Sequence, residues 1–343
     1  MNILIIGGAG FIGSSLANHL LSQGKKVTIL DDLSRKGTKY NLDWLKNIKK
    51  GRLNFIKVNI KKDQKILDKE VARADIVFHF AAQVAVTTSV TDPRNDFEIN
   101  ALGSFNILEA ARKAKNPPVL LYTSTNKVYG EMTNTKVIEK NSRYIYKNLP
   151  LGISEDQPLD FHSPYGCSKG SADQYFHDYA RIYNLPTIVF RQSCIYGPHQ
   201  FGVEDQGWIA WFNIATVLGK PITIYGNGKQ VRDVLYIDDL INAYLLAIKN
   251  IKKTKGQVYN IGGGPNFTIS IWNDFAPILE KLLGRKLFVN YMKSRPGDQL
   301  IYVSDIRKAK KDFGWEPKIS PSEGIKKVYD WVCKNKNLFK NFK

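Results

Sequence analysis

A glycine-rich run that directly follows a short apolar stretch constrains the fold of this chain more than any other feature. The apolar stretch is residues 3–6 (ILII), and the run is residues 7–13 (GGAGFIG), with glycines at positions 7, 10 and 13. In a strand–turn–helix unit, Gly7 permits a tight turn, Gly10 lets backbone approach a pyrophosphate, and Gly13 lets the helix pack on the strand. The N-terminus is therefore predicted to be a buried strand, a phosphate-binding turn and a helix, and not a signal peptide.

Apolar runs alternate with amphipathic stretches through the first two-thirds of the chain. The runs with strand character are residues 2–6, 26–31, 53–58, 76–80, 119–123 and 187–191. Helical periodicity lies between them, most extensively at residues 11–21, 97–114 and 164–183. Short strands that alternate with helices indicate a parallel sheet covered on both faces. Right-handed crossovers then give an α/β, doubly wound domain of the Rossmann type.

The alternation stops after about residue 194, where glycine and proline mark shorter elements. We expect residues 1–193 to form the dinucleotide-binding domain, with residues 232–262 returning to it. Residues 194–231 and 263–335 are expected to form a smaller C-terminal substrate-binding lobe. The lysine- and asparagine-rich last residues are expected to fray.

The chain is basic, with a net charge of +19. Lysine and arginine attract phosphate, so nucleic-acid binding is one interpretation. The lysines are scattered in short runs and lie in no nucleic-acid motif, which favours a solvated surface that draws in an anionic substrate such as a nucleotide. We expect no nucleic-acid partner and, because no apolar stretch reaches ~20 residues, no membrane partner. Three cysteines without paired spacing favour a reduced, cytoplasmic setting.

An acidic residue at the end of the second predicted strand indicates which dinucleotide binds. Asp31 lies about twenty residues after the glycine run, where its carboxylate can accept hydrogen bonds from both adenosine ribose hydroxyls. It would repel a 2′-phosphate, so NAD is predicted over NADP, although Arg35 can pair with a phosphate. Asn59 and Ile60, after the third strand, are placed to bracket adenine. His79 lies inside an apolar strand and is predicted to be a packed core residue.

Tyr165 and Lys169 indicate the chemistry. They lie one helical turn apart, so their side chains share a helix face. A tyrosine has a reference pKa of ~10, and an adjacent ammonium and a positive nicotinamide ring both favour the phenolate; lowering the pKa by ~3 units corresponds to ~4 kcal/mol. A surface Tyr–Lys pair without function is the alternative. Thr125, at the carboxyl end of a predicted central strand, favours the functional interpretation because open α/β sheets bind ligands there.

These residues together resemble the extended short-chain dehydrogenase/reductase family of nucleotide-sugar enzymes. The resemblance covers nearly the whole chain and rests on these segments besides the glycine run: 83–89 (QVAVTTS), 124–127 (STNK), 191–197 (RQSCIYG), 204–208 (EDQGW) and 313–317 (FGWEP). It implies that Thr125, Tyr165 and Lys169 occupy the family's catalytic positions. It also implies an NAD-dependent epimerase, without a metal, that assembles as a homodimer or homotetramer.

Within the family, the resemblance implies inversion of C2 in a CDP-linked 3,6-dideoxyhexose. The ring carbon would be oxidised transiently to a keto-sugar and reduced again by the same bound cofactor. Such a reaction belongs to carbohydrate biosynthesis, including that of lipopolysaccharide O-antigen. One alternative is an epimerase acting at C4 of another nucleotide sugar, such as UDP-glucose, with the same catalytic residues. An alternative of another class is a non-catalytic NAD-binding regulator.

Differences from the family pattern refine this expectation. Related dehydratases carry an Asp-Glu pair where Asn126 and Lys127 stand, and the absence of that acid pair argues against water elimination. Many relatives have asparagine at the position of Cys194, which we expect to act as a small buried hydrophobe and not as a nucleophile. Arg232 and Arg295 match positions that bind the substrate diphosphate, although interdomain salt bridges are the alternative.

The resemblance and the patterns above give two sets of expected binding residues. The expected cofactor-binding residues are Gly7, Gly10, Phe11, Ile12, Gly13, Asp31, Ser34, Arg35, Asn59, Ile60, Ala81, Ala82, Gln83, Asn100, Thr123, Tyr165, Lys169 and Gln192. The expected substrate-binding residues are Val86, Thr125, Asn126, Ser193, Gln206, Arg232, Arg295 and Asp298.

Overall fold

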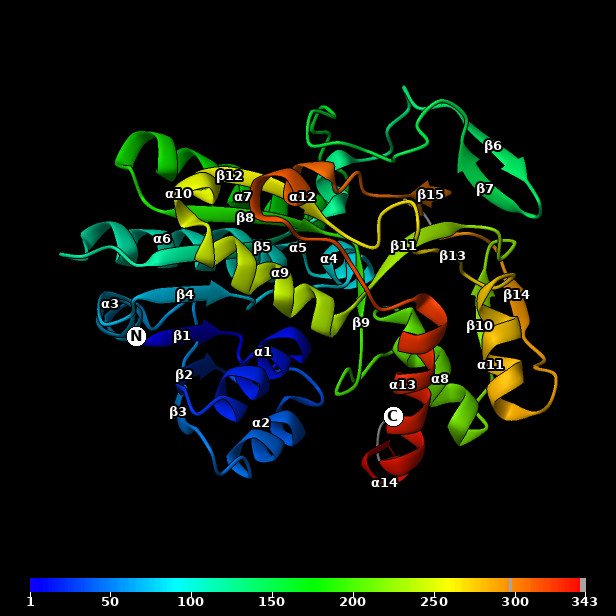
Figure 1. Ribbon diagram of the computed structural model, residues 1–343, viewed down its shortest axis with the longest axis horizontal. Helices are drawn as coiled ribbons and strands as arrows, with labels where there is room; N and C mark the ends of the chain where they lie inside the picture. The colour runs from blue at the N-terminus through cyan, green and yellow to red at the C-terminus, as the bar shows by residue number, and fades with distance from the viewer. Residues whose placement is uncertain (296–297, 340–343) are drawn as a thin grey trace.

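A seven-stranded parallel sheet forms the centre of the larger part of the molecule (Figure 1). The computed structural model describes residues 1–295 and 298–339. The two residues between Arg295 and Asp298, and the last four residues, which were expected to fray, lie outside this range. The sheet order is β12-β8-β5-β4-β1-β2-β3. Its strands are β1 (Ile3–Ile6), β2 (Lys26–Asp31), β3 (Arg52–Lys57), β4 (Ile76–His79), β5 (Val119–Thr125), β8 (Thr187–Gln192) and β12 (Gln257–Ile261).

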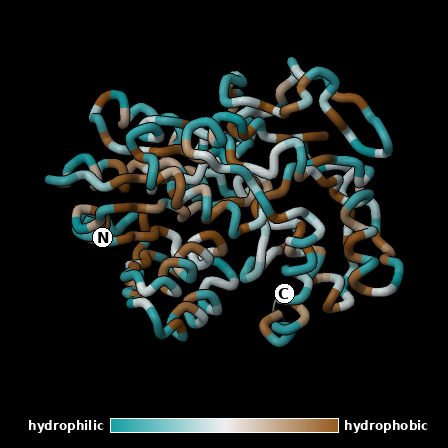
Figure 2. Tube along the Cα trace, in the orientation of Figure 1, coloured by the Kyte–Doolittle hydropathy of each residue, from teal (hydrophilic) through white to brown (hydrophobic). Residues whose placement is uncertain are grey.

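Both faces of this sheet are buried, which explains the continuous apolar runs in the sequence. Along β1, Ile3 and Ile5 belong to one hydrophobic cluster, whereas Leu4 and Ile6 belong to another on the opposite face. Figure 2 shows the strands as apolar segments within more polar surroundings. The first face is covered by α1 (Phe11–Ser22) and α9 (Ile237–Lys249), and the second by α3 (Gln64–Ala72), α6 (Gly103–Lys113) and α7 (Ser163–Tyr183). The predicted doubly wound, Rossmann-type sheet is confirmed.

The helix expected over residues 97–114 differs in detail. The structure has α5 (Pro93–Phe97), a π-helical turn (Glu98–Leu102) and then α6. Asp92 caps α5 by accepting a hydrogen bond from the backbone nitrogen of Asn95 at 3.1 Å. A π turn widens the helix locally and often occurs at functional sites. Here it contains Asn100, one of the expected cofactor-binding residues.

A second, less regular part is built mainly from the C-terminal third (Figure 1). Strand β11 (Val231–Tyr236) is its centre and pairs with β9 (Cys194–Tyr196), β13 (Thr268–Ser270) and β15 (Ile301–Tyr302). Strands β10 (Thr223–Tyr225) and β14 (Asn290–Met292) form a separate parallel pair. The helices of this part are α8 (Trp208–Leu218), α11 (Phe275–Leu283), α13 (Pro321–Lys334) and α14 (Lys336–Phe339).

The segment between β5 and α7 leaves the large sheet and packs on this second part. It contains the hairpin β6 (Val137–Lys140) and β7 (Arg143–Tyr146). Tyr146 and Ile153 share a hydrophobic cluster with Val231 and Tyr302 of the second part. The cluster holds the two parts together behind the carboxyl ends of the strands. No helix among residues 1–295 and 298–339 is long and apolar enough to cross a membrane.

The remaining short elements connect these layers. They are α2 (Thr38–Lys46), α4 (Val86–Thr91), a 3₁₀ turn (Asn126–Tyr129), α10 (Ile251–Thr254) and α12 (Arg307–Phe313). Helix α2 lies beyond β2, and the 3₁₀ turn directly follows β5. These two places flank the cleft at the carboxyl edge of the sheet, where ligands of open α/β sheets bind.

Candidate active site

The glycine turn between β1 and α1 has the geometry that a dinucleotide requires. Gly7 has φ +80°, and a Cβ at this residue would lie 2.4 Å from the backbone nitrogen of Ala81. A Cβ on Gly13 would lie 2.3 Å from the carbonyl oxygen of Gly7. Helix α1 begins after Gly10 without any side-chain cap, so its first N–H groups face the turn. A pyrophosphate is the group that such an uncapped N-terminus binds, so the turn fits NAD.

The Asp31 carboxylate lies at the end of β2, where the adenosine ribose is expected. It accepts hydrogen bonds from the backbone nitrogens of Ala9 at 3.0 Å and Leu33 at 2.8 Å. Each carboxylate oxygen retains a lone pair, so two ribose hydroxyls can still donate to it. Burial raises the pKa of Asp31, and the two backbone N–H groups oppose that rise. These contacts fix the carboxylate orientation that ribose recognition needs.

Two neighbours of Asp31 extend the expected cofactor site in different ways. The Arg35 guanidinium donates to the Gln206 side-chain oxygen at 3.0 Å and so reaches from the larger part to the second part. Ser34 turns back instead, and its hydroxyl donates to Asp32 at 2.6 Å. Arg35, an expected cofactor-binding residue, thus contacts Gln206, an expected substrate-binding residue, across the mouth of the cleft.

The residues expected beside adenine use their polar groups locally. The Asn59 side-chain oxygen accepts from the backbone nitrogen of Lys61 at 3.0 Å. Ile60 is buried in the cluster on one sheet face, where its side chain packs against Gly103. These two residues can shape an adenine pocket through backbone and apolar surface, and their side chains offer it few free hydrogen-bonding groups.

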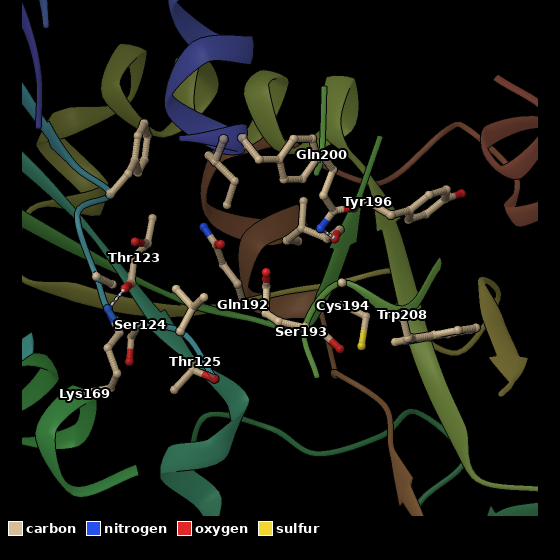
Figure 3. Close-up of a pocket in the computed structure, with 18 of the residues that line it drawn as sticks. Thr123, Ser124, Thr125, Lys169, Gln192, Ser193, Cys194, Tyr196, Gln200 and Trp208 are labelled. Carbon is tan, nitrogen blue, oxygen red and sulfur yellow. Dashed lines mark hydrogen bonds between the residues drawn. The ribbon is translucent and has the colours of Figure 1, made fainter. Parts of the chain in front are cut away.

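The strand ends β4, β5 and β8 enclose a cavity of about 250 Å³ beside the glycine turn (Figure 3). In Figure 3, Thr123, Thr125 and Lys169 lie on one side and Ser193, Cys194 and Trp208 on the other. The expected residues that line this cavity are Phe11, Ile12, Ala82, Thr123, Thr125, Tyr165, Lys169, Gln192, Ser193 and Gln206. Residues that are far apart in the sequence therefore meet in one cavity beside the glycine turn.

Tyr165 is buried in the first turn of α7 and contacts Thr125 at the end of β5. The two hydroxyls share a hydrogen bond that favours the phenolate, as does the positive charge of Arg35. Burial outweighs both and raises the pKa of Tyr165 to about 12. The phenol is thus placed to exchange a proton with a substrate hydroxyl, but it needs additional positive charge to ionise near neutral pH.

Lys169 is buried one turn later, and burial lowers its pKa to about 7. Its ammonium donates to the carbonyl oxygen of Thr123 at 2.5 Å (Figure 3) and lies 4.3 Å from the centre of the Tyr122 ring. In this arrangement Arg35 is a cation that lowers the pKa of Tyr165, and an effect of Lys169 on that pKa stays a prediction. The positive nicotinamide ring remains the second cation that the prediction invoked.

A buried carboxylate below Lys169 was missed by the sequence analysis. Asp96 of α5 is fully buried and accepts from the Ser168 hydroxyl at 2.5 Å and from the Asn100 side-chain nitrogen at 3.1 Å. The negative charges of Asp173 and, to a smaller extent, Asp96 raise the pKa of Lys169. A sequence signal was available in part, because Asp96 precedes Asn100 by one helical turn. Burial in this network is a property of the packing of α5 on α7, which the sequence pattern does not reveal.

Asn100 links that network to the strand-end loop. Its side-chain oxygen accepts from the backbone nitrogen of Gln83 at 2.9 Å, and its side-chain nitrogen donates to the Gln83 carbonyl oxygen at 3.1 Å. The Gln83 side chain closes its own turn on Ala85. Ala81 follows β4 and donates to the carbonyl oxygen of Ile6 at 3.0 Å. Asn100 and Gln83 therefore hold the loop beside the cofactor cleft.

Gln192 and Ser193 close the far side of the cavity at the end of β8. The Gln192 side-chain nitrogen donates to the Tyr244 hydroxyl at 2.5 Å. The Ser193 hydroxyl donates to the Asp233 carboxylate of β11. Cys194 is partly buried between the two parts, and burial raises the pKa of its thiol. A raised pKa keeps the thiol protonated, in agreement with the expectation of a non-nucleophilic residue.

A second cavity of about 320 Å³ shares Thr125 and Tyr165 with the first and extends towards β10 and β11. Arg232 lies in it, 3.9 Å from Asp298, and Arg295 lies 2.8 Å from Asp205. The expected substrate residues that line it are Val86, Thr125, Asn126, Gln206, Arg232, Arg295 and Asp298. The two arginines thus lie together in one cavity that opens onto the tyrosine, and both have acidic partners, as the salt-bridge alternative anticipated.

This placement of a phenol, a hydroxyl and an amine beside a dinucleotide turn suits redox chemistry on a substrate that reaches in from the second cavity. The class of protein is an NAD-dependent enzyme of the short-chain dehydrogenase/reductase type. Comparison with known proteins narrows the class: the model of the NAD dependent epimerase/dehydratase family matches residues 3–262. The chain belongs to this family.

Similar proteins include both epimerases and dehydratases. CDP-paratose 2-epimerase of Salmonella typhi is 44% identical over 340 residues, which are 97% of this chain and 99% of that protein. A dTDP-glucose 4,6-dehydratase of Salmonella typhimurium is 32% identical, with 100% of this chain and 96% of that protein covered. The crystal structure of UDP-glucuronic acid 4-epimerase from Bacillus cereus, in complex with UDP-glucuronic acid and NAD, has a TM-score of 0.83 at 30% identity and covers 98% of this chain and all of that one.

Proposed function

We propose that this protein is a CDP-paratose 2-epimerase, which inverts C2 of a CDP-linked 3,6-dideoxyhexose and so interconverts CDP-paratose and CDP-tyvelose. The observation that carries the proposal is the position of Tyr165, whose hydroxyl shares a hydrogen bond with Thr125 where the two cavities meet. The choice of sugar and carbon is supported by the 44% identity to the Salmonella typhi enzyme over nearly the whole chain.

The residues of this chain supply positioning and proton transfer. NAD, when bound, supplies an acceptor for hydride from the sugar carbon and later a donor to its opposite face. Thr125 orients the ring hydroxyl, and Tyr165 takes its proton as the carbon is oxidised and returns it when the keto-sugar is reduced. Lys169 binds the nicotinamide ribose and contributes positive charge to the centre. The keto-sugar must turn over between the two steps, so the sugar ring itself should be held loosely.

The second cavity is proposed to hold the nucleotide diphosphate. Arg232 and Arg295 are suited to it because a guanidinium binds phosphate oxygens in pairs. When the substrate binds, each arginine would either keep its ion pair with Asp298 or Asp205 beside the diphosphate, or exchange that carboxylate for the diphosphate. Asn126 stands where dehydratases have an acid, so elimination of water is not expected. Residues 194–231 and 263–335 are proposed as the substrate-binding lobe. Strand β11, most of which the sequence analysis assigned to the dinucleotide-binding domain, pairs with β9, β13 and β15 of this lobe and is proposed to belong to it.

The test is turnover of a nucleotide-sugar panel without added cofactor. We expect NMR to show CDP-tyvelose formed from CDP-paratose, and the purified protein to absorb as a dinucleotide-bound enzyme. A need for a continuous supply of oxidised NAD would contradict internal recycling. Dehydration of the sugar would contradict the epimerase assignment itself.

A C4 epimerase is the second candidate. The Bacillus cereus 4-epimerase shares the fold over the whole chain, and C4 inversion would use the same tyrosine and threonine. Including UDP-glucose and UDP-galactose in the panel separates the two candidates by product. A non-catalytic NAD-binding regulator would show no turnover with any sugar, although it would have no use for the buried Tyr165 and Lys169.

Assembly and location complete the proposal. We place the protein in the cytoplasm, because its three cysteines are all unpaired in a structure that describes each of them. A homodimer or homotetramer is proposed, with α6 and α7 in the subunit interface. Exposed Phe105, Tyr175 and Ile182 support this choice of surface.

A further inference from the structure

Lys127 occupies the space between the reaction centre and the two arginines. It follows β5 in the 3₁₀ turn, and its backbone nitrogen donates to the Thr125 hydroxyl oxygen at 3.2 Å. Its side chain extends the other way, towards the second part, and lines the cavity that contains Arg232 and Arg295. Lys127 thus lines the same cavity as Tyr165, Arg232 and Arg295.

The ammonium is held by a neutral group. Its Nζ donates to the Gln299 side-chain oxygen at 3.3 Å. Gln299 is buried, and its own side-chain nitrogen donates to the Gly130 carbonyl oxygen at 2.6 Å, which fixes the orientation of the amide. Arg232 and Arg295, in contrast, have carboxylate partners. Among residues 1–295 and 298–339, no carboxylate forms an ion pair with Lys127 within 4.0 Å.

A desolvated cation without a counterion costs free energy that an anionic ligand can recover. The charged and titratable groups that act on the Lys127 ammonium are Arg232 of β11, Asp298 and Cys194 of β9. Burial, with the repulsion from Arg232, lowers the pKa of Lys127 to about 8. Asp298 opposes this lowering of the pKa. Its ion pair, however, is with Arg232, so its single charge does not neutralise both cations.

We propose that Lys127 binds the sugar-proximal phosphate of the nucleotide sugar. This inference rests on the proposed function and deepens it, because it assigns to Lys127 a role in substrate binding beyond the absence of a dehydratase acid. Thr125, Lys127 and Tyr165 line the same cavity, so a phosphate bound by Lys127 would place the anomeric end of the sugar between that phosphate and Tyr165. C2 is bonded to the anomeric carbon C1, which carries the phosphate, whereas C4 lies on the opposite side of the ring from C1. Lys127 thus favours presentation of C2 to Tyr165.

The experiment is calorimetric titration of the full-length, NAD-loaded protein with CDP and with cytidine. Lys127→Met should weaken CDP binding roughly 10- to 100-fold, the range of one charge-assisted hydrogen bond to phosphate. Binding of cytidine, which has no phosphate, should be unchanged. Lys311→Met, at an exposed lysine of α12, is the matched control and should leave both affinities unchanged.

The proton balance of CDP binding tests the role independently of Lys127→Met. Phosphate binding favours the charged amine, so the wild-type protein should take up a proton with CDP as the pH rises above about 8, and its affinity should fall between pH 8 and 9.5. Titrations in buffers of different ionisation enthalpy measure this uptake. Lys127→Arg should keep most of the affinity but lose the uptake, since an arginine stays protonated over this range.

Three results would overturn the proposal. They are unchanged CDP affinity in Lys127→Met, proton uptake that persists in Lys127→Arg, and a wild-type affinity for CDP that does not depend on pH between 7 and 9.5. None of these measurements requires turnover. If UDP binds better than CDP, the assignment of the base fails, and the same Lys127 comparison is then made with UDP.

Discussion

At the scale of single residues, the tyrosine at the cavity junction determines whether the molecule is an enzyme. Burial raises the pKa of Tyr165 to about 12, while the Thr125 hydroxyl and Arg35 act in the opposite direction. Removing only the hydroxyl, in Tyr165→Phe, should lower kcat ~10²- to 10⁴-fold, the usual contribution of a general acid–base group. The retained dinucleotide, measured by absorbance, should be unchanged. Tyr291→Phe, at an exposed tyrosine of β14, is the control; a similar loss there would point to instability.

The sequence predicted which side chains meet but not how their charges are arranged. Tyr165, Lys169 and Thr125 could be paired from helical spacing and from the rule that strand ends bind ligands. The bond from Lys169 to the Thr123 carbonyl oxygen depends on the separation of α7 from β5, which spacing along one helix does not contain. The burial of Asp96 depends in the same way on contacts between two helices.

At the scale of elements, the glycine turn couples cofactor binding to the packing of α1 on β1. A Cβ on Gly13 would overlap the Gly7 carbonyl oxygen, so Gly13→Ala must displace either the helix or the turn. We expect a loss of ~1–3 kcal/mol in the free energy of unfolding and a clear drop in the NAD that co-purifies. Chemical denaturation and absorbance measure these two effects.

A second glycine variant separates the packing effect from backbone strain. Gly284 has φ +71°, and an added Cβ there would have nothing within 4 Å. Gly284→Ala should therefore cost only the ~1–2 kcal/mol of a left-handed alanine, with NAD content unchanged. An equal loss of NAD in both variants would contradict a direct role for the turn at Gly13.

The strands of the large sheet were predictable because both of their faces are buried. A continuous apolar run gave β2 with its observed bounds. The π turn at Glu98–Leu102 was not predictable, because a helix that widens locally keeps the same apolar periodicity. The hairpin β6–β7 packs on the second part through long-range contacts of Tyr146, and a sequence pattern does not specify such contacts.

At the scale of the whole molecule, an aromatic stack joins the two parts through α2 and α13. The His199 ring lies 3.5 Å from the centre of the Trp44 ring in α2 and 4.9 Å from that of Trp331 in α13. Burial lowers the pKa of His199 to about 4. Asn41 of α2 also donates to the His199 carbonyl oxygen, at 3.3 Å. The stack should therefore make the attachment of α13 sensitive to acid.

The sign of that pH dependence follows from the lowered pKa. Between pH 6.5 and about 4, the unfolded chain binds a proton at His199 that the folded chain does not, so the free energy of unfolding falls as the pH decreases. The full shift corresponds to at most ~3 kcal/mol. Denaturant titrations should show a shallower pH dependence for His199→Asn, in which asparagine tolerates the φ of +65° at this position. His19→Asn in α1 is the control, and an identical pH dependence in wild type and His199→Asn would refute the assignment.

An exposed apolar face on the larger part indicates where copies of this chain can assemble. Large apolar side chains are exposed along one face made by α5, the π turn, α6 and α7: Phe97, Leu102, Phe105, Tyr175, Ile182 and Tyr183. Phe105 and Tyr175 are in edge contact, with ring centres 5.6 Å apart, so the face is continuous from α6 to α7. Exposed apolar surface of this extent is typical of a subunit interface. Helices α5 and α7 also carry Asp96, Tyr165 and Lys169. A subunit interface on this face would therefore stabilise the helices that position these side chains.

A charge on that face should therefore separate the subunits. Ile182 is 65% exposed in the last turn of α7, and Ile182→Arg would place a guanidinium on this apolar face. Light scattering should show a fall in molar mass to that of the 38.9 kDa chain or to half of a tetramer. Phe288→Arg, at a residue that is 91% exposed outside this face, should leave the mass unchanged. If Phe288→Arg separates the subunits and Ile182→Arg does not, the interface lies in the second part, and α6 and α7 are supported by their own packing alone.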